Sequence, residues 1–126
     1  MNRGLSLNQA TVRKLTAPEA IELCVRHDIP AIGLWRDAVA DFGLARTAAA
    51  ARAAGVHVSS LCRGGFFTCA DPVGRAAALA GNRAAVAEAA ELEADTLVLV
   101  SGGLPAGSRD LPAARAMIEE IGRAHV

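Results

Sequence analysis

The chain has 126 residues, of which 52% are hydrophobic and 21% charged, and its 13 Lys and Arg balance 13 Asp and Glu. This length corresponds to one domain, the apolar composition excludes a disordered chain, and the zero net charge excludes the basic field of a nucleic-acid-binding protein. The three cysteines lack a metal-binding spacing, and no apolar run has the length of a signal peptide or membrane span, so we expect a cytoplasmic protein without disulfides or membrane contact.

Apolar runs predict four strands along the chain. Residues 5–9 alternate apolar and polar side chains, which is the two-residue period of a strand. Residues 31–35 and 96–100 are nearly unbroken apolar runs, as expected for parallel strands covered on both faces. Residues 56–62 are predicted as the third strand, followed by a loop that contains Gly64 and Gly65.

A helix is predicted after each strand, and the first has the clearest start. Thr16 caps a first-turn amide, Glu19 reaches back to the Thr16 backbone, and Pro18 is tolerated in the first turn. Pro30 ends this helix, because the residue before a proline avoids helical geometry. Its predicted buried face holds Ile21, Cys24 and Val25.

Three further helices are predicted. The second covers about residues 44–54 and closes at Gly55. The third starts at Asp71 and Pro72 and extends to about residue 93, and the last covers about residues 111–123. Glu88, in the third, is expected on a solvated face. The predicted apolar side of that helix holds Leu79, Val86, Ala89 and Leu92.

The predicted order is therefore βα repeated four times, in a single (βα)4 domain over residues 1–126. Strands that alternate with helices form a parallel sheet with right-handed crossovers. An open doubly wound sheet and one half of a (β/α)8 barrel both satisfy this order. A complete barrel needs about 250 residues, so length alone favours the open sheet. In both architectures, ligands bind at the carboxyl ends of the strands.

Residues at these carboxyl ends are the candidates for substrate binding. The Trp35 ring can stack on the C–H face of a ligand, and Arg36 and Arg63 can hold a carboxylate or phosphate by paired hydrogen bonds. The thiol of Cys62 is expected to be a packing group rather than a nucleophile, since no histidine is near it in sequence. The candidate substrate-binding residues are Asn8, Gln9, Trp35, Arg36, Arg63 and Phe66.

Each candidate also has a structural alternative. Asn8 and Gln9 can satisfy loop backbone, and Trp35 can be buried beneath the next helix. Arg36 and Arg63 can pair with Asp37 or Asp41. Tight turns explain the pairs Gly64-Gly65 and Gly102-Gly103, because neither matches a phosphate-binding fingerprint.

Three segments carry a family resemblance: residues 5–11, 29–37 and 58–68. They resemble the N-terminal half of sugar phosphate isomerase/epimerase proteins of the xylose isomerase-like TIM barrel superfamily, the AP endonuclease family 2 type. The resemblance implies a metal-dependent enzyme in which Mn, Mg, Co or Zn polarises a sugar carbonyl while glutamates move a proton beside it. The family commonly has glycine where this chain has Glu93.

The resemblance also implies that the metal ligands lie on later barrel strands, so this chain alone is expected to lack them and to be inactive. The implied partner is a small sugar or keto-polyol. The alternative is a non-catalytic α/β module, or a truncated product, that self-associates as a homodimer through the exposed edges of its first and fourth strands.

Overall fold

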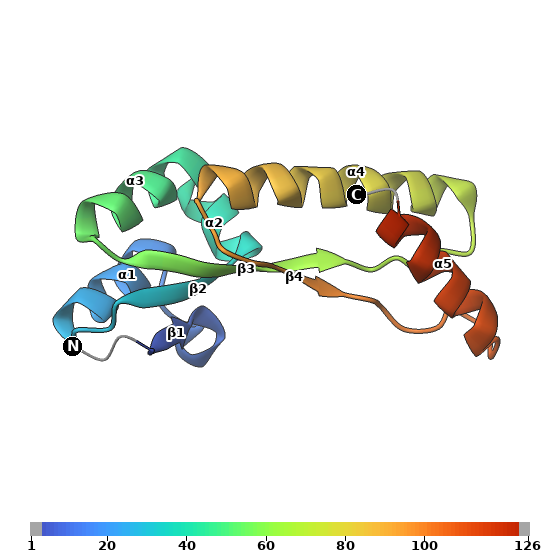
Figure 1. The fold of residues 1–126 in the computed structure, drawn as a ribbon, viewed down its shortest axis with the longest axis horizontal. Helices are drawn as coiled ribbons and strands as arrows, with labels where there is room; N and C mark the ends of the chain where they lie inside the picture. Colours follow the sequence, from blue (N-terminus) through green and yellow to red (C-terminus); the bar gives the residue numbers. More distant parts are fainter. Residues whose placement is uncertain (1–3, 124–126) are drawn as a thin grey trace. The chain divides into compact units, whose positions relative to one another are not determined.

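The computed structural model describes residues 4–123. Within them, four parallel strands alternate with helices and form one sheet in the order β1-β2-β3-β4 (Figure 1). This confirms the predicted α/β class with consecutive βα units. The strands are β1 (Ser6–Asn8), β2 (Ala31–Trp35), β3 (His57–Gly65) and β4 (Leu97–Val100).

The helices agree with the predicted ones in place, with two additions. A 3₁₀ helix, η1, follows β1 directly, and a short helix, α2, precedes the predicted second helix. Gly43 separates α2 from α3 with a φ of 107°, a conformation that favours glycine. The helices are η1 (Gln9–Val12), α1 (Ala17–Arg26), α2 (Arg36–Phe42), α3 (Leu44–Ala54), α4 (Pro72–Glu91) and α5 (Leu111–Arg123).

The chain forms two compact units. Among the described residues, the first contains residues 4–63 together with Ala85–Val98, and the second contains Gly64–Ala84 and residues 99–123. In the first unit, β1 pairs with β2 and β2 with β3, with Asn8 opposite Gly33 in the register. Because the strands are parallel, their carboxyl ends lie at one edge of the sheet.

The core of the first unit lies between the sheet and its helices. Ile32, Leu34 and Leu61 are completely buried in β2 and β3. The buried positions of α1 are Ala17, Ala20, Ile21 and Cys24, which recur at the spacing of one helix face.

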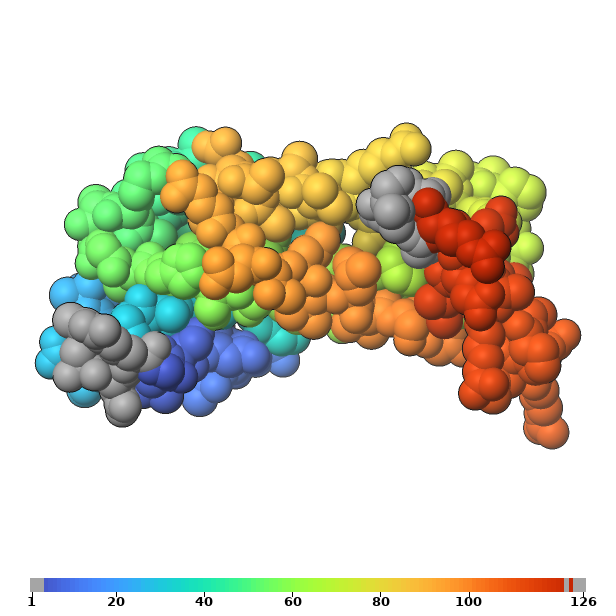
Figure 2. All heavy atoms as spheres, viewed as in Figure 1, coloured from blue at the N-terminus to red at the C-terminus, as the bar shows by residue number. Residues whose placement is uncertain are grey.

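Several apolar side chains lie elsewhere than predicted. Val25 in α1 is 51% exposed, because it is displaced from the buried face by one residue. Val86 is 49% exposed and Ala85 is buried in its place, whereas Ala89 and Leu92 are buried as predicted, so the predicted apolar side of this helix was wrong at Val86. Val98 and Leu99 of β4 are 39% and 51% exposed, although their continuous apolar run is typical of a covered strand, and the β4 segment lies at the surface in Figure 2.

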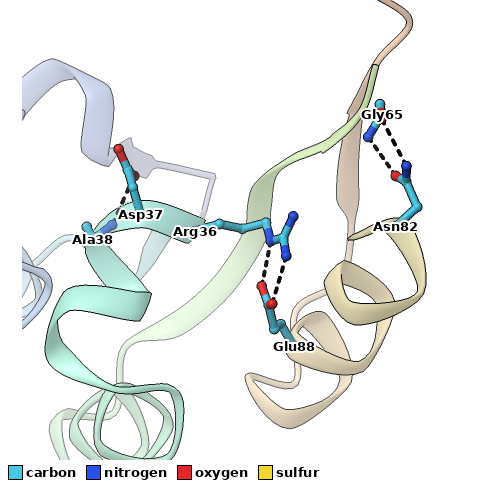
Figure 3. Close-up of polar contacts among 6 residues, drawn as sticks. All are labelled: Arg36, Asp37, Ala38, Gly65, Asn82 and Glu88. Atoms are coloured by element: carbon cyan, nitrogen blue, oxygen red, sulfur yellow. Dashed lines mark hydrogen bonds and ion pairs between the residues drawn. The ribbon is translucent and has the colours of Figure 1, made fainter. Parts of the chain in front are cut away.

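The second unit is organised around Gly65, the last residue of β3. The predicted strand ended at Cys62, whereas the observed strand includes both glycines. The Gly65 N–H donates to Asn82 Oδ1 at 2.6 Å, and Asn82 Nδ2 donates to the Gly65 carbonyl at 2.9 Å (Figure 3). A Cβ at Gly65 would overlap the Val100 backbone. Close packing of two backbones therefore explains this glycine.

Candidate functional site

The ends of β1 and β2 are joined by two hydrogen bonds from Trp35. The indole Nε1 of Trp35 donates to Asn8 Oδ1 at 3.0 Å, and the Trp35 backbone N–H donates to Gln9 Oε1 at 2.9 Å. Asn8 Oδ1 also accepts from the Ala10 N–H at 3.0 Å and so caps η1. The oxygens of Asn8 and Gln9 thus satisfy local groups, which was the structural alternative for these residues.

Gln9 has a further property that the sequence does not reveal. It is only 3% exposed, and its Nε2 is a buried donor without a hydrogen-bond partner among residues 4–123. The amide orientation follows from the neighbouring N–H of Trp35, which requires the carbonyl oxygen on its side. Gln9 therefore presents an unsatisfied NH₂ group on the opposite side.

Two arginines approach the Trp35 ring. The guanidinium carbons of Arg13 and Arg63 lie 5.5 and 5.9 Å from a ring centroid of the indole, within the range of cation–π attraction. Trp35 is only half-buried. The structure thus brings Arg63 close to Asn8, Gln9 and Trp35, as expected for residues that follow the carboxyl ends of neighbouring parallel strands. Arg13 was not predicted, because the turn of η1 carries it back from β1 toward the ring.

Arg36 points elsewhere, to the side chain of Glu88 in α4. Its Nε and Nη2 donate to the two Glu88 carboxylate oxygens at 2.5 and 2.8 Å (Figure 3). These hydrogen bonds raise the pKa of Arg36. As the structural alternative, we predicted Asp37 or Asp41 as the ion-pair partner of Arg36, and this was wrong because the partner is Glu88. The prediction that Glu88 lies on a solvated helix face was also wrong.

Asp37 stands at the start of α2 with Arg36, but its carboxylate is turned to the helix itself. Its Oδ1 accepts from the Ala38 N–H at 2.9 Å (Figure 3). A carboxylate in the first turn is stabilised there by the positive end of the helix dipole. Asp37 thus remains a charged group at the edge of the site rather than a partner of Arg36.

Cys62, at the end of the predicted third strand, and Phe66, in the predicted loop after it, have different surroundings. Cys62 is half-buried within β3, and burial raises the pKa of its thiol, which disfavours the thiolate needed for nucleophilic attack. Phe66 belongs to the second unit, where its N–H donates to the Val100 carbonyl at 2.6 Å and its side chain is 45% exposed. A substrate contact by Phe66 remains a prediction.

A pocket of about 520 Å³ opens beside Trp35 within the first unit. One wall comes from η1 and the turn that leads into α1, and the other comes from α2. Its volume is in the range of small-molecule sites. The polar and aromatic residues that line it include Gln9, Arg13, Lys14, Trp35, Asp37 and Asp41.

Among residues 4–123, no three His, Cys, Asp or Glu side chains are grouped so that they could hold a metal ion. No helix in the same range is long and apolar enough to cross a bilayer.

One solved structure is similar over almost the whole chain. It is the crystal structure of protein SMc04130 from Sinorhizobium meliloti 1021, with a TM-score of 0.92 and 50% sequence identity, covering 96% of this chain and 44% of that chain. The chain thus spans less than half the length of this similar protein. Since 96% of 126 residues corresponds to 44% of that chain, SMc04130 has about 275 residues in its structure. No family model and no curated protein matches the chain.

Proposed function

We propose that this chain is the substrate-side (βα)4 half of a metal-dependent sugar isomerase or epimerase with a (β/α)8 barrel, acting in the cytoplasm. The observation that carries the proposal is the meeting of three successive strand ends around one indole ring. Asn8 ends β1, Trp35 ends β2 and Arg63 lies near the end of β3, and both Asn8 and Arg63 contact the Trp35 side chain. Convergence of this kind is typical of a barrel active site.

Two further findings support a half-barrel. The similar protein SMc04130, at about 275 residues, has the length of a complete barrel, which needs about 250. Val98 and Leu99 of the apolar strand β4 are exposed in this chain, as expected if the other half of a barrel would cover them. The resemblance of residues 5–11, 29–37 and 58–68 to sugar phosphate isomerase/epimerase proteins supplies the reaction class.

The residues of this chain bind and orient the substrate in this proposal. The exposed part of the Trp35 ring stacks on the C–H face of a sugar, and Asn8 Nδ2 and the Arg63 guanidinium donate hydrogen bonds to its oxygens, since Asn8 Oδ1 already accepts from Trp35 and Ala10. The described residues do not suit a divalent metal ion, so no step through a metal is assigned to them. In the complete barrel, the metal would polarise the carbonyl and would be held by the other half.

Solvent deuterium exchange tests the proposal on many sugars with one readout. Proton transfer beside a carbonyl incorporates deuterium from D₂O into the sugar, and proton NMR detects this across a panel of ketoses and aldoses with Mn²⁺ or Co²⁺. We expect exchange from SMc04130 and from a chimera that joins this chain to the part of SMc04130 outside the match. We expect none from this chain alone.

Two variants and two contradicting outcomes complete the experiment. Trp35→Ala in the chimera should reduce exchange at least tenfold, whereas Arg83→Gln, an exposed change in α4, should not affect it. Exchange by this chain alone would contradict the assignment of metal and base to the other half. An intact SMc04130 that exchanges no sugar on the panel would overturn the proposed reaction class.

A second candidate function is a non-catalytic module that self-associates. The exposed Val98 and Leu99 on β4, an edge strand of the sheet, favour it. Analytical ultracentrifugation tests this function. Self-association would be supported by a dimer that dissociates in the variant Leu99→Lys but stays intact in Val73→Lys, a change at an exposed position of α4. A monomer at about 100 μM, a concentration well above the dissociation constant of a stable dimer, would exclude it.

A further inference from the structure

Trp35 is a half-buried aromatic residue whose two N–H groups are both bound by side-chain oxygens of one segment. The indole Nε1 donates to Asn8 Oδ1 at 3.0 Å, and the backbone N–H donates to Gln9 Oε1 at 2.9 Å. Asn8 ends β1 and Gln9 begins η1. Two consecutive side chains therefore hold Trp35, one at its ring and the other at its backbone.

The bond from Asn8 is the directional contact that sets the plane of the indole. Within the described range, Asn8 makes the only hydrogen bond to the Trp35 ring. Arg13 and Arg63 approach the ring by cation–π attraction, at 5.5 and 5.9 Å from a ring centroid, and this attraction tolerates a range of orientations. A hydrogen bond instead weakens steeply when its angle departs from linear. The orientation of the ring thus depends on Asn8 more than on the two arginines.

The backbone on both sides of the ring is anchored independently of Asn8. Gln9 is 3% exposed and holds the Trp35 N–H, and Arg36, the next residue, is bound at two points by Glu88 (Figure 3). With the backbone fixed, rotation about the side-chain torsions is the freedom that remains to Trp35. Loss of the Asn8 bond should therefore free the ring while β2 stays in place.

Asn8 lies outside the set of described residues that line the pocket, whereas Trp35 belongs to it. The oxygen of Asn8 also accepts from the Ala10 N–H at 3.0 Å, so both hydrogen bonds of this oxygen are made within the protein. In the pocket, Asn8 thus acts on a ligand through Trp35. The hydrogen bond that its Nδ2 can donate to a sugar is a separate contact at the strand ends.

We propose that Asn8 is the positioning residue of this site, because its Oδ1 fixes the Trp35 ring as a stacking surface before a ligand binds. A ring held in one orientation loses less conformational entropy on binding than a rotating ring, so the ligand binds more tightly. Gln9 has the complementary role of holding the end of β2 that carries the ring. The inference rests on the proposed function and names the residue that orients its stacking surface.

Two substitutions of Asn8 separate ring positioning from helix capping. Asn8→Ser keeps a residue type that caps a helix well, but its side chain is too short to reach the indole as well. Asn8→Asp keeps an oxygen for both the indole and the Ala10 N–H, and removes only the Nδ2 donor. Thr11→Ser, an exposed change within η1, is the matched control.

The indole N–H reports directly on the bond, because Trp35 is the only tryptophan of the chain. Proton–nitrogen NMR of the isotope-labelled full chain gives one indole signal, and its exchange with solvent measures the protection by Asn8. We expect this exchange to be about fivefold faster in Asn8→Ser, which corresponds to the loss of one ordinary hydrogen bond. It should be no faster in Asn8→Asp or Thr11→Ser than in the natural chain. Near-UV circular dichroism should lose its tryptophan band in Asn8→Ser alone.

The chimera with SMc04130 gives the functional readout. Asn8→Ser should raise KM for the exchanged sugar about fivefold and leave kcat unchanged, because stacking binds the substrate and the transition state alike. Asn8→Asp keeps the orientation of the ring, so a rise in its KM measures the Nδ2 contact alone.

Three results would overturn the inference: an indole signal in Asn8→Ser equal to that of the natural chain, the same loss of protection in Asn8→Asp, or a loosened ring without a rise in KM. The first is the result that a residue with only a capping role would give. The NMR measurement uses this chain alone and needs no substrate. A chimera that exchanges no sugar would therefore overturn the proposed function, while the indole signal still decides whether Asn8 orients Trp35.

Discussion

The side-chain carbonyl of Gln9 accepts a hydrogen bond from the backbone N–H of Trp35 at 2.9 Å, across 26 residues of sequence. This bond ties η1 to the end of β2. Gln9→Met keeps the length of the side chain but removes the acceptor of the Trp35 N–H. It also removes the unsatisfied Nε2 donor, which offsets part of the loss, so we expect the free energy of unfolding to fall by about 1 kcal/mol in urea denaturation. Thr11→Met, on the exposed side of η1, should change it by less than about 0.5 kcal/mol. Equal stability of the two variants would contradict this role of Gln9.

Arg36 and Glu88 form a two-point ion pair in which each side chain retains about a quarter of its exposure, 28% and 26%. A double-mutant cycle with Arg36→Ala and Glu88→Ala should give a coupling energy of about 1 kcal/mol, because the pair is bidentate and partly shielded. The fully surface pair Arg123 and Glu119, at 3.7 Å, is the matched comparison and should give about 0.3 kcal/mol. Equal couplings would show that the shielded, two-point geometry adds nothing.

Glu93 has a φ of 53°, just beyond the end of α4, where side chains other than glycine are strained. Its ion pair with Arg52, at 3.4 Å, is exposed and contributes little. Glu93→Gly should therefore raise the free energy of unfolding by about 0.5–1 kcal/mol. Glu91→Gly, two residues earlier and still helical, should lower it by about the same amount. Thermal denaturation of the two variants provides the measurement, and a shift in the same direction for both would refute the argument.

Glu19 accepts hydrogen bonds from the Thr16 N–H at 2.7 Å and from the Thr16 hydroxyl at 2.8 Å. These bonds lower the pKa of Glu19 below its ordinary value of 4.5. A carboxyl group whose pKa is lower in the folded chain stabilises the fold at pH values above its pKa in the unfolded chain. This stabilisation is lost as the pH falls below 4.5 and through the pKa of the folded chain. Unfolding followed from neutral to strongly acidic pH should show a smaller acid-induced loss in Glu19→Gln than in the natural chain. Glu22→Gln, an exposed change in the same helix, should keep the full loss.

Local signals predicted the features that depend on neighbours in sequence. Thr16, Pro18 and Glu19 specify the start of α1 within one turn, and the apolar run from Ala31 to Trp35 specifies β2. The short helix α2 was missed because Trp35 at its start provides no capping side chain. The exposure of side chains was predicted less well. In α4, for example, Val86 was predicted on the apolar side, but Ala85 is the residue that is buried there.

The sequence by itself determined the order of four strands and their helices, and it placed Asn8, Trp35 and Arg63 at strand ends that a parallel sheet must bring to one edge. Only the tertiary structure decided which groups meet there. The bond between Arg36 and Glu88 spans 52 residues, and Arg13 reaches the Trp35 ring only through the turn of η1. Such contacts depend on the packing angles of whole elements, and hydrophobic periodicity and capping residues carry no information about these angles.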